Sequence, residues 1–197
     1  MSKNRLEAFS DGVIAIIITI MVLEMKVPHG TDLAALQPLW PVFLSYVLSF
    51  VYIAIYWNNH HHLMQAARGV NGPILWANAH LLFWLSLMPF VTGWMGENAF
   101  AAVPVAVYGV ALLMCAVAYT ILVRVLLKHH GEDSVLAKAI GSDFKGNISL
   151  LLYIIGTPLA LWQPVWSCAL YFIVAAIWFI PDRRIEKILP ARTPSGE

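Results

Sequence analysis

The chain has 197 residues, of which 60% are hydrophobic and only 12% are charged, and its formal net charge is +1. A soluble domain carries roughly a quarter charged residues, so this composition excludes an ordinary water-soluble protein, and the high hydrophobicity excludes an intrinsically disordered one. A nucleic-acid partner is not expected either, because nucleic-acid-binding proteins carry an excess of basic residues. A polytopic membrane protein remains.

Apolar segments separated by short polar loops define the expected membrane spans. A helix needs about 20 residues to cross the hydrocarbon core, and segments that cross it must satisfy their own backbone hydrogen bonds, so helices are expected. We therefore expect an all-α membrane protein in which residues 1–197 form a single domain of six transmembrane helices. The expected spans are about 6–25, 40–64, 73–95, 100–127, 146–162 and 164–180.

Two prolines fall inside expected spans. Pro89 lies in the third span and Pro158 in the fifth. Proline lacks the backbone N–H that an α-helix needs and its ring clashes with the preceding turn. We therefore expect a kink or local unwinding at both positions.

Positive charge is distributed unevenly between the two sides of this arrangement. All but one of the 12 Lys and Arg residues fall on one side, and only Lys26 falls on the other. Because cytoplasmic loops are rich in Lys and Arg, we expect a multi-pass protein of the cell membrane with both termini in the cytoplasm. Glu24, Asp32 and Glu97 make the outer side mildly acidic, which favours cations. The cytoplasmic set is Lys3, Arg5, Arg68, Arg124, Lys128, Lys138, Lys145, Arg183, Arg184, Lys187 and Arg192.

The first span has a distinct helical stripe. At about 100° per residue, five of its residues fall within an arc roughly 100° wide, whereas Asp11 points some 140° away from Ile16. The stripe can face lipid or core, or it can face a symmetry axis around which copies of Ile16 form an apolar ring. Periodicity alone leaves both arrangements open. The stripe comprises Gly12, Ile16, Thr19, Ile20 and Leu23.

The beginning of this span carries a recognisable motif. Arg5, Phe9, Ser10, Asp11 and Gly12 spell R-x-x-x-F-S-D-G at the start of the helix. The motif resembles the transmembrane protein 175 family of potassium channels, which occur in animal lysosomes and in prokaryotic membranes. Further similarity lies in Trp57-x-x-His60, Asn78 and Leu87-Met88-Pro89-Phe90.

This resemblance implies a potassium-permeable channel without a P-loop filter, in which the first helices line the pore. Carried over to this chain, the apolar ring that gates the pore and makes it selective falls on Ile16. The neighbouring polar layer then falls on Thr19, and Ile20 and Leu23 complete the stripe. Because the motif occurs once, the chain resembles the prokaryotic single-repeat form, a homotetramer. The expected permeant species are potassium and other monovalent cations, with no cofactor and no enzymatic activity.

Polar residues of the first span are expected to brace the pore helix. Asp11 and Ser10 point away from the stripe, and the resemblance places them in a buried network with His60 and Asn78. The alternative for Asp11 is an N-terminal helix residue stabilised by the helix dipole. Arg5 is expected to cap the inner mouth or to pair with an acid such as Asp11.

Histidines form two short runs in the sequence. Consecutive residues on a helix point about 100° apart, so His60, His61 and His62 cannot converge on one metal ion, and no metal site is expected. An interfacial polar cluster is the main interpretation, with pH sensing as an alternative. His129 and His130 are expected in a solvated cytoplasmic loop.

Two other classes of function compete with a channel. A secondary transporter or proton-conducting pathway would use Asp11 and His60, although such proteins usually contain inverted repeats, and none is visible here. An intramembrane enzyme would need a nucleophile–base pair or a metal set at membrane depth, and the sequence suggests neither.

Overall fold

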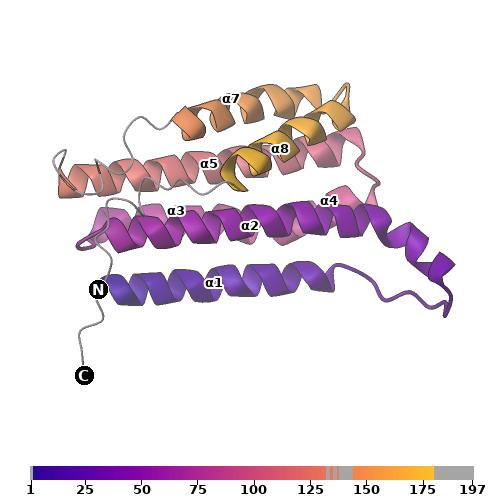
Figure 1. Ribbon diagram of the computed structural model, residues 1–197, viewed down its shortest axis with the longest axis horizontal. Coiled ribbons are helices and arrows are strands. Elements are labelled where there is room, and N and C mark those ends of the chain that lie inside the picture. The colour runs from indigo at the N-terminus through magenta and orange to yellow at the C-terminus, as the bar shows by residue number, and fades with distance from the viewer. Residues whose placement is uncertain (1, 132–133, 135–136, 138–143, 180–197) are drawn as a thin grey trace.

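Figure 1 shows the computed structural model of the chain, in which helices run side by side along the longest axis. The structure describes residues 2–131, 134, 137 and 144–179. Throughout these residues the regular structure is helical, which confirms the expected all-α fold. The helices are α1 (Lys3–Leu23), the 3-10 helix η1 (Leu33–Leu39), α2 (Trp40–Ala66), α3 (Gly72–Ser86), α4 (Met88–Glu97), α5 (Ala102–His130), α7 (Phe144–Leu159) and α8 (Pro164–Phe179).

Among the residues that the structure describes, four helical segments are long and apolar enough to cross a membrane. They are Lys3–Leu23, Leu33–Ala66, Gly72–Glu97 and Ala102–His130. The remaining helices, α7 and α8, have 16 residues each in the described part of the chain. At about 1.5 Å per residue each is about 24 Å long, slightly less than the hydrocarbon thickness of about 30 Å.

Proline explains why the third span consists of two helices. The segment Gly72–Glu97 is interrupted at Leu87, and Pro89 lies in the first turn of α4. The expected kink at this proline is thus confirmed as an interruption of the helix. Pro158 lies within α7, which ends at the next residue, Leu159.

The helices form successive layers, with α1 at one edge of the bundle. α1 packs against α2, α3 and α4, and α5 packs on the opposite side against α3, α4, α7 and α8. Figure 1 shows α1 and α7 on opposite sides of the intervening helices. The shared core includes Leu81 and Leu85 of α3 and Leu112 and Cys115 of α5, all fully buried.

Charged residues gather at the two ends of this bundle. The Lys3 ammonium donates to the Ala67 carbonyl (3.1 Å), so the start of α1 meets the loop between α2 and α3. At the other end Lys26 and Glu97 join the loop after α1 to the end of α4 (2.6 Å). Five of the residues expected on the cytoplasmic side and the last residue of the sixth expected span lie outside the described part of the chain. They are Lys138, Arg183, Arg184, Lys187, Arg192 and Ile180.

Candidate pore-lining site on the first helix

The first helix has two faces that differ sharply in burial. Its buried residues recur every three or four positions, which is the spacing of one helical face. This face packs against α2, α3 and α4. The buried set is Leu6, Ser10, Ile14, Ile17 and Met21.

The stripe identified in the sequence lies on the opposite, exposed face. Ile16 is 58% exposed, Ile20 43% and Leu23 77%. Gly12 and Thr19 of the stripe are exposed too. Arg5 and Phe9 continue the same face toward the N-terminus. A single subunit therefore leaves this largely apolar stripe uncovered.

The Thr19 hydroxyl hydrogen-bonds to its own helix. It lies 2.9 Å from the carbonyl oxygens of both Ala15 and Ile16, to which it donates its proton. A hydroxyl oxygen has two acceptor lone pairs in addition to its donor. Because the proton points back along the helix, the oxygen can still accept a hydrogen bond from water or contact a cation.

A groove follows the stripe along its border with α4. It has a volume of about 630 Å³, and Ile16 and Ile20 line one wall. On the α4 wall, the rings of Phe90 and Trp94 stack with their centroids 6.1 Å apart. Glu24 lines the groove where α1 ends. The groove therefore extends the exposed apolar surface from α1 onto α4.

The charges near this end of the groove are partly neutralised. The hydrogen bond and the negative charge of Glu97 raise the pKa of Lys26, so the ammonium form is favoured. Glu24 lies over Gly93 of α4, where an added Cβ would be 3.1 Å from a carboxyl oxygen. Because Lys26 is engaged by Glu97, the carboxylate of Glu24 remains to make this end of the groove negative.

A chain of buried hydrogen bonds ties α1 to α2 and α3. The Asn78 amide donates to Ser10 Oγ (2.9 Å), and its carbonyl oxygen accepts from His60 Nε2 (2.7 Å). Ser10 in turn donates to the Leu6 carbonyl (2.8 Å). Ser10, Asn78 and His60 are each no more than 1% exposed. The directions of these bonds require a proton on His60 Nε2, and Nδ1 of the same ring is buried without a partner.

Asp11 makes a different contact from the one expected. Its carboxyl oxygen accepts a hydrogen bond from the Trp57 indole (3.0 Å), whereas Asn78 bonds to Ser10 and to His60. Successive residues on a helix diverge by about 100°. Ser10 therefore points into the interior, and Asp11 points along the surface of α2. Within the described residues Arg5 forms no ion pair with Asp11, in contrast to one of the expected arrangements.

A second contact between α1 and α2 lies one helical turn from the bond between Asp11 and Trp57. Glu7 Oε1 lies 3.0 Å from His61 Nδ1, and Gln65 reaches the other ring nitrogen of His61 (2.7 Å). Glu7 precedes Asp11 by four residues, and His61 follows Trp57 by four, as antiparallel neighbouring helices require. The first two of the three consecutive histidines thus diverge, since His60 contacts Asn78 and His61 contacts Glu7.

The expectation for the second histidine pair is wrong. His129 and His130 form the last turn of α5 instead of a solvated loop. His130 Nε2 accepts from the backbone N–H of Arg68 (2.9 Å), and His129 Nδ1 accepts from the Asn71 amide (3.1 Å). Sequence periodicity could not reveal these contacts because they join segments about 60 residues apart.

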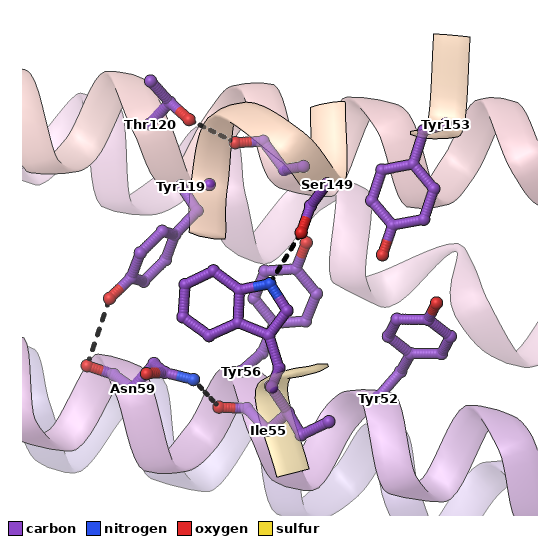
Figure 2. A pocket seen from close by; sticks show the side chains of 11 residues that line it. Tyr52, Ile55, Tyr56, Asn59, Tyr119, Thr120, Ser149 and Tyr153 are labelled. Atoms are coloured by element: carbon purple, nitrogen blue, oxygen red, sulfur yellow. Dashed lines mark hydrogen bonds between the residues drawn. The ribbon is translucent and has the colours of Figure 1, made fainter. Parts of the chain in front are cut away.

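A small cavity lies away from α1, among α2, α5, α7 and α8 (Figure 2). Tyr119 donates to the Asn59 carbonyl (3.3 Å), and the Trp178 indole donates to Ser149 Oγ (2.8 Å). The volume of about 40 Å³ accommodates roughly one water molecule, which takes about 30 Å³ in the liquid. Small-molecule sites typically occupy about 300 Å³ or more, so we assign the cavity to packing and hydration.

Known proteins share both the sequence and the arrangement of this helix. The family model of the endosomal/lysosomal potassium channel TMEM175 matches residues 5–89, which contain nearly all of α1 and the whole of α2 and α3. A potassium channel of Chryseobacterium sp. (strain P1-3) is 58% identical over 189 residues, which cover 96% of this chain and 98% of that protein. The chain belongs to the TMEM175 family. The resemblance found in the R-x-x-x-F-S-D-G motif is thereby confirmed at the level of the family.

Structural similarity extends the TMEM175 assignment to most of the chain. The crystal structure of a lysosomal potassium-selective channel TMEM175 homolog from Chamaesiphon minutus matches with a TM-score of 0.77 and 29% identity, covering 91% of this chain and 97% of that one. The human endosomal/lysosomal proton channel TMEM175 is 33% identical over 116 residues, which are 53% of this chain and 23% of that protein. The TMEM175 relatives are channels, so the chain belongs to a family of multi-pass membrane channels and not to a family of enzymes.

Proposed function

We propose that the chain forms a potassium-permeable channel of the cell membrane, as a homotetramer whose α1 stripes surround the pore. The observation that carries the proposal is the exposed apolar stripe on α1 of a TMEM175-family chain. The potassium channel of Chryseobacterium and the potassium-selective homolog of Chamaesiphon support potassium as the permeant ion. The concentration of described cations near Lys3, with Lys26 at the other end, supports cytoplasmic termini.

Symmetry offers a reason why the stripe faces a pore. One subunit presents a single such stripe, at the edge of its bundle, and cannot surround an ion path with it. Cyclic assembly places identical surfaces around one axis. The groove between α1 and α4 lies beside the stripe, so a neighbouring copy that packs there also covers Phe90 and Trp94.

The residues of the stripe have distinct roles in this proposal. A ring of Ile16 side chains stops ions by dewetting when it is narrow, and passes partly hydrated ions when it widens. The oxygen of Thr19 contacts the ion or its water, since its proton is held by the helix carbonyls. Ile20 and Leu23 continue the apolar wall toward Glu24, whose charge raises the local concentration of cations. Selectivity is expected to be modest because no cage of carbonyls replaces the hydration shell.

The bracing residues hold this stripe in place. Ser10, Asn78 and His60 fix the rotation of α1 from its buried side, and Asp11 with Trp57 fixes it from the α2 side. Phe9 and Gly12 of the motif lie on the exposed face. Arg5 lies at the N-terminal end of the same face, at the inner mouth of the proposed pore.

Reconstitution tests the proposal directly. Purified protein in planar bilayers is expected to give unitary current steps, with a reversal potential that shifts toward the potassium equilibrium potential when potassium and sodium gradients are opposed. Ile16→Asn is expected to raise conductance and to weaken the preference for potassium, because an amide hydrates the constriction. Ile154→Asn is the matched control, since Ile154 on α7 is 56% exposed, almost as much as Ile16.

The same recordings separate the channel from its rivals. A secondary transporter or proton pathway through Asp11 and His60 predicts slow, saturable flux without unitary steps. Unchanged conductance and selectivity in Ile16→Asn would show that the constriction lies elsewhere.

A further inference from the structure

The end of α5 holds the loop between α2 and α3 through one imidazole ring. His130 Nε2 lies 2.9 Å from the backbone nitrogen of Arg68 and 3.4 Å from that of Gly69. On the other side of the ring, Nδ1 lies 2.9 Å from the Leu126 carbonyl oxygen. The ring thus bridges the last turn of α5 and two consecutive loop amides.

The partners of this ring fix its protonation state. A backbone N–H can only donate and a carbonyl can only accept. His130 therefore accepts through Nε2 and donates through Nδ1, which is the neutral form with its proton on Nδ1. A second proton would sit on Nε2 and point at the N–H groups of Arg68 and Gly69. The contact with the loop is incompatible with the imidazolium form.

The same loop is attached to α1. The Lys3 ammonium donates to the carbonyl of Ala67, the residue before Arg68 (3.1 Å). Asn71, at the other end of the loop, accepts from the Ile74 N–H at the start of α3 (3.1 Å), and α3 carries the Asn78 that bonds to Ser10 of α1. The position of the loop therefore affects two attachments of α1, the bond from Lys3 to the loop and the bond from Asn78 to Ser10.

The described charged groups around this contact come from α1, the loop and the last turn of α5. Among these residues Lys3, Arg68 and Lys128 are basic, and Glu7 of α1 is engaged by His61. The ring of His129 lies 5.0 Å from that of His130.

We propose that His130 is a pH-sensitive latch that holds residues 67–71 against α5 when neutral and releases them when protonated. An unperturbed imidazole titrates between about pH 5 and 8. The latch contributes stability above this range and loses it as the pH falls through the range, because only the released state accepts the second proton. Acidification on the side of the membrane that holds the N-terminus thus loosens the anchor of α1. The proposed channel function places that side in the cytoplasm, and the latch itself does not depend on ion flux.

Hydrogen exchange of the purified full-length protein in lipid nanodiscs tests the latch. Exchange of the Arg68 and Gly69 amides is measured at pH 8 and pH 5.5 and corrected for the intrinsic effect of pH. In the wild type, protection is expected to fall several-fold from pH 8 to pH 5.5, because only the released state accepts the second proton. His130→Gln keeps a neutral donor and acceptor, so its protection is expected to stay within about twofold across the same range.

A matched histidine variant and a pH series complete the test. His129→Gln is expected to lose protection as the wild type does, because the bond of His129 to the Asn71 side chain leaves no backbone N–H dependent on it. Equal wild-type protection at both pH values overturns the proposal, as does a His129→Gln variant that abolishes the change. The His130→Gln variant is uninformative if its Arg68 and Gly69 amides are unprotected already at pH 8. In that case the pH series of the wild type decides, and a midpoint of its loss of protection outside pH 5–8 overturns the proposal. None of these outcomes depends on whether the protein conducts potassium.

Discussion

The polar contacts that attach α1 to its neighbours differ in burial and in the number of hydrogen bonds they contain. Asn78 uses both its amide and its carbonyl in the chain from His60 to Ser10, where all three side chains are buried. Buried polar groups that lose a partner are costly in a low dielectric. Asp11 and Trp57 form a single bond at the exposed edge of the same interface. The buried chain is therefore expected to contribute more to the orientation of α1.

The bond between Asp11 and Trp57 can be measured by a double-mutant cycle. Trp57→Phe keeps an aromatic ring and removes the indole N–H, and Asp11→Ala removes the acceptor. The coupling free energy is expected to be about 0.6 kcal/mol, as for interhelical hydrogen bonds in membrane proteins. Reversible unfolding in mixed micelles measures it.

The control for this cycle replaces an exposed tryptophan. Trp76 of α3 is 78% exposed, and Trp76→Phe combined with Asp11→Ala is expected to show additive effects on the free energy of unfolding. Equal coupling energies in the two cycles would contradict a specific bond from Trp57.

At the scale of the helix, close packing explains features that single residues do not. Asp11 with Trp57 and Glu7 with His61 form successive rungs between α1 and α2, each separated by four residues. Such regular spacing depends on two helices that run antiparallel along each other. Residues of the motif thus contact both α2 and α3. These contacts fix the rotation of α1 about its axis, and the same rotation leaves the stripe exposed.

A glycine in α5 lies where α5 packs closely against α7 and α8. A Cβ on Gly109 would overlap the hydroxyl of Tyr171 on α8 and lie 2.7 Å from Thr157 Oγ1 on α7. Gly109→Ala is therefore expected to destabilise the protein by about 1–3 kcal/mol, the usual cost of overpacking. Thermal unfolding in detergent measures the loss.

Another helical glycine offers a matched control for this substitution. A Cβ on Gly72, at the start of α3, meets nothing within 4 Å. Gly72→Ala is expected to change stability by no more than about 0.5 kcal/mol. A Gly109→Ala protein as stable as Gly72→Ala would show that α7 and α8 can move away from α5.

At the scale of the whole molecule, the exposed stripe and the adjoining groove require a partner or lipid to cover them. Only 28% of the most apolar window of α1 is buried, the same share as for the segment Leu33–Ala66 and less than the 50% of Gly72–Glu97. The two ends of the bundle also differ, with basic residues near Lys3 and an acidic side chain, Glu24, near the end of the stripe. In the proposed tetramer the neighbouring copies cover the apolar surface, and Glu24 faces the ion path.

Cross-linking between subunits tests this arrangement. Leu23→Cys is expected to yield covalent dimers with a short bis-maleimide or a mild oxidant, because the stripes of neighbouring copies converge on the axis. Val165→Cys on α8 is expected to remain monomeric under the same conditions. Both side chains are similarly exposed in one subunit, at 77% and 75%, and Cys168→Ala removes the partly exposed native thiol. Denaturing gel electrophoresis measures the products, and equal dimer yields would contradict the tetramer.

Local patterns determined the class of fold and the face of α1 on which the proposed pore-lining stripe lies. Long apolar runs lead to membrane helices because no other local structure satisfies the backbone in lipid, and the spacing of Ile16, Ile20 and Leu23 puts them on one side of a helix. The same reasoning located the interruption near Pro89, since proline acts within its own turn. The R-x-x-x-F-S-D-G motif added the family.

Contacts between distant segments were decided only by the tertiary structure. Asp11 forms its hydrogen bond with Trp57 instead of His60, and His130 accepts from the backbone amides of Arg68 and Gly69. Nothing in the local pattern of residues 27–39 indicated a 3-10 helix at Leu33–Leu39. Periodicity specifies the direction of a side chain relative to its own helix, whereas its partner depends on the rotation and register of neighbouring helices. Those variables are set by packing of the entire bundle, and no single segment contains them.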